Sequence, residues 1–229
     1  NNAQSVQDVA ATCANLGAGT NLNCSAGIHM ATVNGFTLDK VDVNGSNQVC
    51  INGNNVTTFS MTNSSQVRNC GNEANENGMQ FANLLGTSTI TGVTFSNNYH
   101  SALDVVNTVA TAGTLNVTSA SFTGNGIGTH GSTLVKYSGD GTANMIINVQ
   151  SSSFNGSNSY GYFTDTATTA HVTSTINNST FGTVSANALG IQYVNSASSD
   201  IDFTVTNNTI VGGNALNGFL TNLSTTILT

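Results

Sequence analysis

The sequence predicts an all-β fold, a single parallel β-helix of about seven coils, and three observations support this prediction. The first is a repeated unit in which an aliphatic residue is followed, after small polar residues, by a large apolar residue five positions on. The second is a strand-like segment before each unit, and the third is a set of Asn-, Gly- and Ser-rich turns between them. Self-similarity at a period of about 20 to 50 residues is typical of solenoid proteins.

The repeated unit is clearest at Val117–Phe122, Ile90–Phe95 and Ile176–Phe181. We interpret Val33–Leu38 as an earlier copy, and the stretch from Met61 to Val67 as a copy distorted by one residue. The apolar residues that end the units lie 27 to 32 positions apart and should stack as one core ladder. The predicted ladder is Leu38, Val67, Phe95, Phe122, Phe154, Phe181 and Ile210.

Two regions follow from this pattern. Residues 1–27 are irregular and are predicted to form an N-terminal cap, whereas residues 28–229 are predicted to form the β-helix. The strand-like segments that precede the units mostly alternate between apolar and polar residues, as strands with one buried face do. They are Gly78–Phe81, Ala102–Val105, Thr133–Tyr137, Gly161–Phe163, Ala188–Tyr193 and Gly218–Leu220.

The composition excludes several classes of partner. Ten acidic residues face only three basic ones, so no Lys/Arg cluster exists to bind nucleic acid or an anionic membrane surface. No apolar run is long enough for a membrane span. The sequence starts at Asn1 and stops in the strand-like segment Ile227–Thr229, from which we expect a processed piece of a longer protein or a subunit whose ends are covered.

Three segments carry a resemblance to known proteins: Gly92–Asn98, Ala120–Asn125 and Ile176–Phe181. With these repeats the chain resembles the right-handed parallel β-helix of the pectate-lyase-like superfold. More narrowly, it looks like repeat regions of large secreted or surface-displayed bacterial proteins, the adhesins and autotransporter passengers. The resemblance implies an extracellular or cell-surface location, but the superfold includes lyases, hydrolases, adhesins and inert spacers, so it implies no activity.

Charged residues are few enough to align individually. Counting from the ladder residues predicts that Asp39 and Arg68 are neighbours on adjacent coils, and that Asp104 and Lys136 are neighbours as well. Solvent-exposed pairs of this kind contribute about 0 to 1 kcal/mol. We therefore interpret both pairs as surface ion pairs, with a catalytic Lys or Arg as the alternative.

Asp200 and Asp202 form the best acidic pair in the sequence. Two residues apart on one strand, their carboxylates should project from one outer face about 7 Å apart, and His171 should be the neighbour of Asp200 on the next coil. A solvated patch is the favoured interpretation, and the alternatives are a weak Ca²⁺ site or a catalytic acid/base pair. Glu73 and Glu76 are a second weak Ca²⁺ candidate, and a plain loop is favoured there too. No other metal or cofactor is predicted.

The four cysteines lie in the first third of the chain and suggest two disulfides with three connectivities. Cys13–Cys24 together with Cys50–Cys70 is the favoured pairing. Cys24–Cys50 is an alternative, because a spacing of 26 could place the two on adjacent coils. Free buried thiols are a further alternative.

Asparagine is abundant enough to give many glycosylation sequons by composition alone. Asn98 and Asn125 each follow a ladder Phe by three positions and should form a stacked amide ladder. The candidate glycosylation sites are Asn55, Asn116, Asn155, Asn178 and Asn222.

The function that these features favour is a non-catalytic extracellular solenoid, a structural or adhesive segment of a surface-displayed or filament-forming protein. Its expected partners are neighbouring copies, flanking solenoid segments, glycans or a cell surface. One alternative is a polysaccharide lyase or hydrolase that uses Asp200, Asp202 and His171. Another is a glycan-binding module with stacking aromatics at Tyr99, Tyr160 and Tyr193, although Tyr193 fits the core better.

Overall fold

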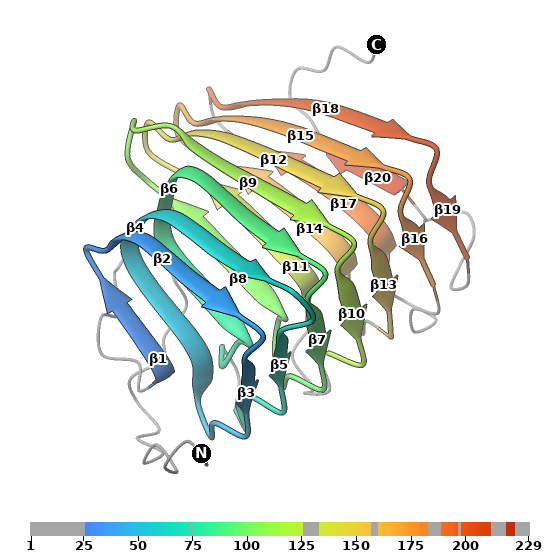
Figure 1. Ribbon diagram of the computed structural model, residues 1–229. Coiled ribbons are helices and arrows are strands. Elements are labelled where there is room, and N and C mark those ends of the chain that lie inside the picture. The colour runs from blue at the N-terminus through green and yellow to red at the C-terminus, as the bar shows by residue number, and fades with distance from the viewer. Residues whose placement is uncertain are drawn as a thin grey trace.

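The computed structural model describes residues 26–73, 75–125, 133–156, 160–182, 189–196, 198–211 and 219–222. Within these ranges the structure contains β-strands and no helix, and the paired strands run parallel. The chain is a parallel β-solenoid of about 6 turns, against about seven predicted (Figure 1). The predicted cap at residues 1–27 lies almost entirely outside the described residues.

The strands lie on three faces of the solenoid, which we call the front, side and rear sheets; the front and rear sheets are joined through the long strands β4 and β6 into one 13-stranded sheet, and the side sheet has 7 strands (Figure 1). The front sheet contains β2 (Asn34–Asp39), the second halves of β4 (Val49–Thr62) and β6 (Met79–Thr91), then β9 (Gly113–Thr118), β12 (Asn144–Gln150), β15 (His171–Asn177) and β18 (Asp200–Thr206). The side sheet contains β3 (Asp42–Asn44), β5 (Gln66–Arg68), β7 (Thr94–Ser96), β10 (Ser121–Thr123), β13 (Ser153–Asn155), β16 (Thr180–Phe181) and β19 (Thr209–Ile210).

The rear sheet contains β1 (Ala26–Ala31), the first halves of β4 and β6, then β8 (Leu103–Asn107), β11 (Thr133–Gly139), β14 (Tyr160–Thr166), β17 (Leu189–Asn195) and β20 (Phe219–Asn222). From β6 onward these strands correspond to the strand-like segments that the sequence places before the repeated units. Their inward residues are in register from coil to coil, beginning with Met79, Leu103 and Val135. The alternation of apolar and polar residues therefore gives the rear sheet one face toward the core.

The predicted phenylalanine ladder is confirmed. Phe95, Phe122, Phe154 and Phe181 are register partners on successive coils, and each is 0% exposed. Their ring centroids are 4.9, 4.8 and 4.6 Å apart, and their planes are tilted by no more than 8°. Ile210 continues the ladder in register but is 40% exposed.

The first member of the predicted ladder is wrong. Val43, and not Leu38, is the register partner of Val67 in the side sheet. Leu38 pairs instead with Met61 in the front sheet, in the row of aliphatic residues that starts each unit. The first unit therefore begins at Leu38 and ends at Val43, five positions later. Val33 and Leu38 have the motif's spacing by coincidence. Both Val33–Leu38 and Leu38–Val43 are apolar pairs five positions apart, so the spacing alone does not distinguish them.

Asn98 and Asn125 form the predicted amide ladder. Both are fully buried, and Nδ2 of Asn98 donates a hydrogen bond of 2.6 Å to Oδ1 of Asn125. The same side chains serve the backbone, since Oδ1 of Asn98 accepts the N–H of Cys70 and its Nδ2 also donates to the carbonyl of Val67. The ladder thus satisfies backbone groups at corners where no strand pairs with them.

A disulfide joins Cys50 to Cys70 with a Cα–Cα distance of 5.5 Å. This confirms half of the favoured pairing and excludes Cys24–Cys50. The predicted partner bond, Cys13–Cys24, lies outside the described residues. The bond links β4 of the rear sheet to the corner after β5.

Peptide mapping under non-reducing conditions is expected to recover a cross-linked peptide that contains both Cys50 and Cys70. Reduction before digestion should release two separate peptides, because no other bond joins them. A cross-linked peptide containing Cys50 and Cys24 would contradict the structure.

No helix in the described ranges is long and apolar enough to cross a membrane.

Candidate functional site

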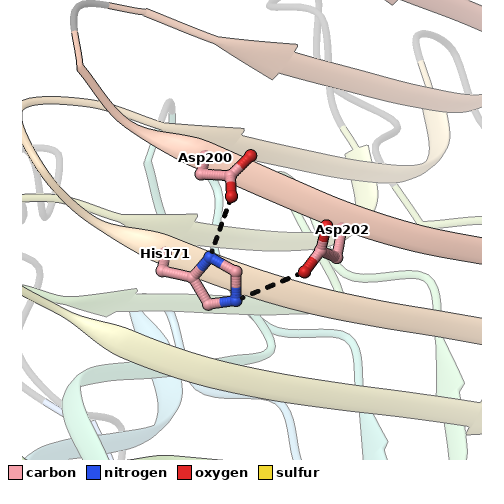
Figure 2. A group of neighbouring side chains, drawn as sticks. All are labelled: His171, Asp200 and Asp202. Atoms are coloured by element: carbon pink, nitrogen blue, oxygen red, sulfur yellow. Dashed lines mark ion pairs between the residues drawn. The ribbon is translucent and has the colours of Figure 1, made fainter. Parts of the chain in front are cut away.

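The acidic pair predicted from the sequence lies at the start of β18, where the outer face of the front sheet carries His171 beside it (Figure 2). His171 on β15 is the register partner of Asp200, and Thr173 is the partner of Asp202. Ile201 between the two aspartates is buried, so both carboxylates point outward. The predicted neighbour relation between His171 and Asp200 is confirmed.

The imidazole lies between the two carboxylates (Figure 2). Its Nδ1 is 3.4 Å from Oδ2 of Asp200, and its Nε2 is 3.6 Å from Oδ2 of Asp202. A ligand atom of each residue lies within 4.8 Å of the others. The side chains are 38, 58 and 62% exposed for His171, Asp200 and Asp202, so water screens their interaction.

This arrangement suits a solvated polar patch better than a reactive centre. One nitrogen of His171 and one oxygen of each aspartate make only three ligand atoms, and all three side chains are at least 38% exposed. Ca²⁺ takes about 6 to 8 oxygen ligands, far more than two exposed carboxylates supply. Asn144 and Ile146 on β12 are the register partners of His171 and Thr173, and both are exposed on the same outer face.

The predicted pair of Asp104 and Lys136 is in register, but its carboxylate is not on the surface. Asp104 and Lys136 are partners on β8 and β11, as predicted. Asp104 is only 3% exposed, however, so the interpretation as a surface ion pair is wrong. Burial raises the pKa of Asp104 to about 6; the Lys136 ammonium acts in the opposite direction, and Asp165 adds to the rise.

Asp104 belongs to a strip of buried oxygens on the outer face of the rear sheet that have no hydrogen-bond partner among the described residues. Four consecutive strands, β8, β11, β14 and β17, each contribute one such atom. The atoms are Asp104 Oδ1, Ser138 Oγ, Asp165 Oδ1 and Gln192 Oε1. Alternation places these residues outward, and an outward position is normally solvated. Sequence reasoning missed the strip because period two reports which side a residue faces and nothing about what covers that side.

Arg68 pairs with Asp42, and not with Asp39 as predicted. Its Nε and Nη2 donate to Oδ1 and Oδ2 of Asp42 at 3.0 and 2.7 Å. The pKa of Asp42 is lowered, first by this hydrogen bonding. The misplaced Leu38 explains only part of the error. Counted from Val43, the register partner of Arg68 is Asn44, and the Arg68 side chain reaches diagonally to Asp42, the partner of Gln66.

The glutamate candidates do not form an open ligand set. Glu76 is 3% exposed, and its Oε2 accepts the backbone N–H groups of Asn72 and Glu73 at 2.5 and 2.7 Å. The carboxylate of Glu76 therefore closes its own loop, while the side chain of Glu73 is exposed. This supports the plain-loop interpretation.

The candidate aromatic residues have different environments. Tyr193 is 0% exposed and lies 3.0 Å from Ser174 Oγ through its hydroxyl, which confirms its place in the core. Tyr99 and Tyr160 are half-buried. Tyr160 packs against Phe163 with ring centroids 5.2 Å apart.

The candidate glycosylation sites are spread over several elements. Asn55 and Asn178 are exposed and have positive φ, whereas Asn116 and Asn155 are half-buried. Asn116 also accepts a hydrogen bond from Asn148. The side chain of Asn222 lies outside the described residues.

The outer face of the front sheet carries two rows of hydroxyl and amide side chains, which we call the polar face. Lateral hydrogen bonds hold some of them in place, including Thr89 to Ser60 (3.1 Å) and Asn148 to Asn116 (2.9 Å). The first row is Thr37, Ser60, Thr89, Asn116, Asn148, Thr175 and Thr204. The second row is Thr91, Thr118, Gln150, Asn177 and Thr206.

Comparison of the chain with protein-family models, with curated proteins and with solved structures finds no match.

Proposed function

We propose that this chain is a non-catalytic extracellular β-solenoid that serves as a structural or adhesive segment of a surface-displayed or filament-forming protein. The polar face is the observation that carries the proposal. Its two rows repeat every coil, a spacing of about 4.8 Å, and run along the length of the front sheet. Such a face suits a partner that is itself extended and polar, such as a glycan or a neighbouring solenoid.

The physical basis is pre-organisation. The side chains are short, and lateral bonds such as Thr206 to Asn177 (3.2 Å) fix several of them before any partner arrives. Ordering these groups on binding therefore costs little conformational entropy. The Cys50–Cys70 disulfide supports the extracellular part of the proposal, since disulfides persist in oxidising compartments.

Retention on insoluble polysaccharides tests the adhesive role. We expect a double variant of the polar face, Thr91→Lys with Thr206→Lys, to be retained at least about tenfold more weakly than the unaltered chain. Two long charged side chains would prevent an extended ligand from contacting the two rows of the polar face. The control is Thr123→Lys with Thr180→Lys on the side sheet, which adds the same charge at equally exposed positions.

Two outcomes would count against the proposal. Equal loss of retention in both double variants would show that added charge, and not the polar face, controls binding. Release of reducing sugars from the same panel, abolished by Asp202→Asn, would establish an enzyme that uses the His171 group. Retention without turnover, lost only in the front-sheet variant, is the expected result.

A further inference from the structure

One repeated unit differs from the others in length. Met61 and Val67 are six positions apart, whereas their register partners on the next coil, Ile90 and Phe95, are five apart. Next to this unit the pairs Ser60–Thr89, Met61–Ile90 and Gln66–Thr94 are in register, although the register of β4 with β6 shifts by one residue earlier, between Thr57 and Ser60. The additional residue must therefore be accommodated at the corner between the front and side sheets.

The backbone shows where the additional residue sits. Asn63 and Ser64 both have positive φ, at 57° and 62°, whereas the corner of the next coil has a single such residue, Gly92. The bond from the N–H of Lys40 to the carbonyl of Thr62 is stretched to 3.5 Å, while the equivalent bond from Gly92 is 2.9 Å. The first two coils are thus slightly separated at this corner.

A shallow pocket of about 370 Å³, largely open to solvent, lies between the two corners. This volume is at the lower end of the range for small-molecule sites, about 300 to 1,000 Å³, and suits one sugar unit. We call it the corner pocket. Its lining is Lys40, Val41, Asp42, Asn63, Ser64 and Gln66.

The charges around the corner pocket are unevenly partnered. Asp42 is held by two nitrogens of Arg68, and Oδ1 of Asp39 accepts hydrogen bonds from Thr62 and Asn63. By contrast, no ion pair joins Lys40 to an acid within the described part of the chain. Lys40 is one of only two lysines in the sequence, and it lines the corner pocket together with three amide or hydroxyl side chains, the apolar Val41 and the Arg68-paired Asp42.

We propose that the corner pocket binds a single sugar acid. Its carboxylate would accept hydrogen bonds from the Lys40 ammonium, and its hydroxyls would bond to Asn63, Ser64 and Gln66. The site goes beyond the adhesive role proposed above, because it lies at a corner and not on the polar face. The corner has one residue more than the corner of the next coil at the place where the pocket opens, and the register shift between Thr57 and Ser60 offsets that residue within the coil.

Titration of the full chain with free sugars, followed by amide NMR shifts, tests this site. Glucuronate and N-acetylneuraminate are expected to shift the signals of residues 40–42 and 63–66. Glucose and acetate should bind at least about tenfold more weakly, since one lacks the carboxylate and the other the hydroxyls. Equal binding of acetate and glucuronate, equal binding of glucose and glucuronate, or no shift with either acid would overturn the proposal.

Two variants separate the pocket from the fold. Lys40→Asn keeps a residue that tolerates positive φ and is expected to weaken glucuronate binding at least about tenfold. Deletion of Ser64 restores the five-residue spacing and should abolish binding while the β-sheet circular dichroism spectrum is kept. Lys136→Gln removes the same charge elsewhere and should bind glucuronate normally. Loss of binding in Lys136→Gln, or its retention in both pocket variants, would contradict the site.

Polysaccharide retention by the polar face is a separate measurement. The corner pocket fails if sugar acids do not bind, whatever the retention result, and the polar face fails if its double variant behaves like the control. The two proposals are therefore distinguishable.

Discussion

Phe122→Ala is expected to lower the free energy of unfolding by about 3 to 5 kcal/mol, the range for large-to-small changes at buried Phe. The ring is 0% exposed and stacks on Phe95 and Phe154 at centroid distances of 4.9 and 4.8 Å. Its removal leaves a void inside a narrow core and breaks two stacked contacts at once. Equilibrium denaturation in urea, monitored by far-ultraviolet circular dichroism, measures the loss.

The control for this prediction is Phe36→Ala. Phe36 is half-buried and its ring lies 6.4 Å from that of Phe59, so its truncation removes less buried surface. We expect a cost below half that of Phe122→Ala. Equal costs at the two positions would contradict the prediction, because Phe36→Ala removes less buried surface than Phe122→Ala.

Asp104→Asn is expected to stabilise the folded chain at pH 7 by up to about 3 kcal/mol. The pKa of Asp104 is raised from 3.8 to about 6, chiefly by burial, so at pH 7 the folded state holds a charge that burial disfavours. The amide has nearly the same shape and carries no charge. Lys136 and Asp165 are the charged groups that act on this site, and the favourable interaction with Lys136 is smaller than the burial effect.

The pH dependence gives the sign of the effect. A carboxyl whose folded pKa is raised favours the folded state while it is protonated, and this stabilisation is lost as the pH rises through about 4 to 6. The gap between Asp104→Asn and the unaltered chain should therefore open across that window and be near zero below it. Urea denaturation at a series of pH values from 3.5 to 8 measures the gap.

Asp140→Asn is the matched control, because its effect has the opposite sign. The pKa of Asp140 is lowered by hydrogen bonds from the Thr168 hydroxyl and the Gly141 N–H, so the ionised form favours folding. Asp140→Asn should destabilise the chain at neutral pH, and this destabilisation should disappear in acid, where the carboxyl of the unaltered chain is protonated. If Asp104→Asn is no more stable than the unaltered chain at pH 7, burial does not penalise the charge of the Asp104 carboxylate.

The periodic part of the fold could be predicted because each coil repeats the same local rule. Phe95, Phe122, Phe154 and Phe181 follow small polar residues at a fixed distance, and parallel pairing then stacks them. The same counting placed His171 beside Asp200 and Lys136 beside Asp104. It failed at Leu38, where two apolar pairs of equal spacing compete and only the pairing of β2 with β4 chooses between them.

The amino-acid sequence by itself determined the all-β class, the rung spacing and the neighbours in the regular coils, because side-chain alternation and corner residues act locally. Tertiary structure decided the rest: the partner of Arg68, the burial of Asp104 and the pocket between the first two coils. Each depends on how one coil sits against another or on what covers an outer face. The local sequence pattern does not contain information on these contacts between coils.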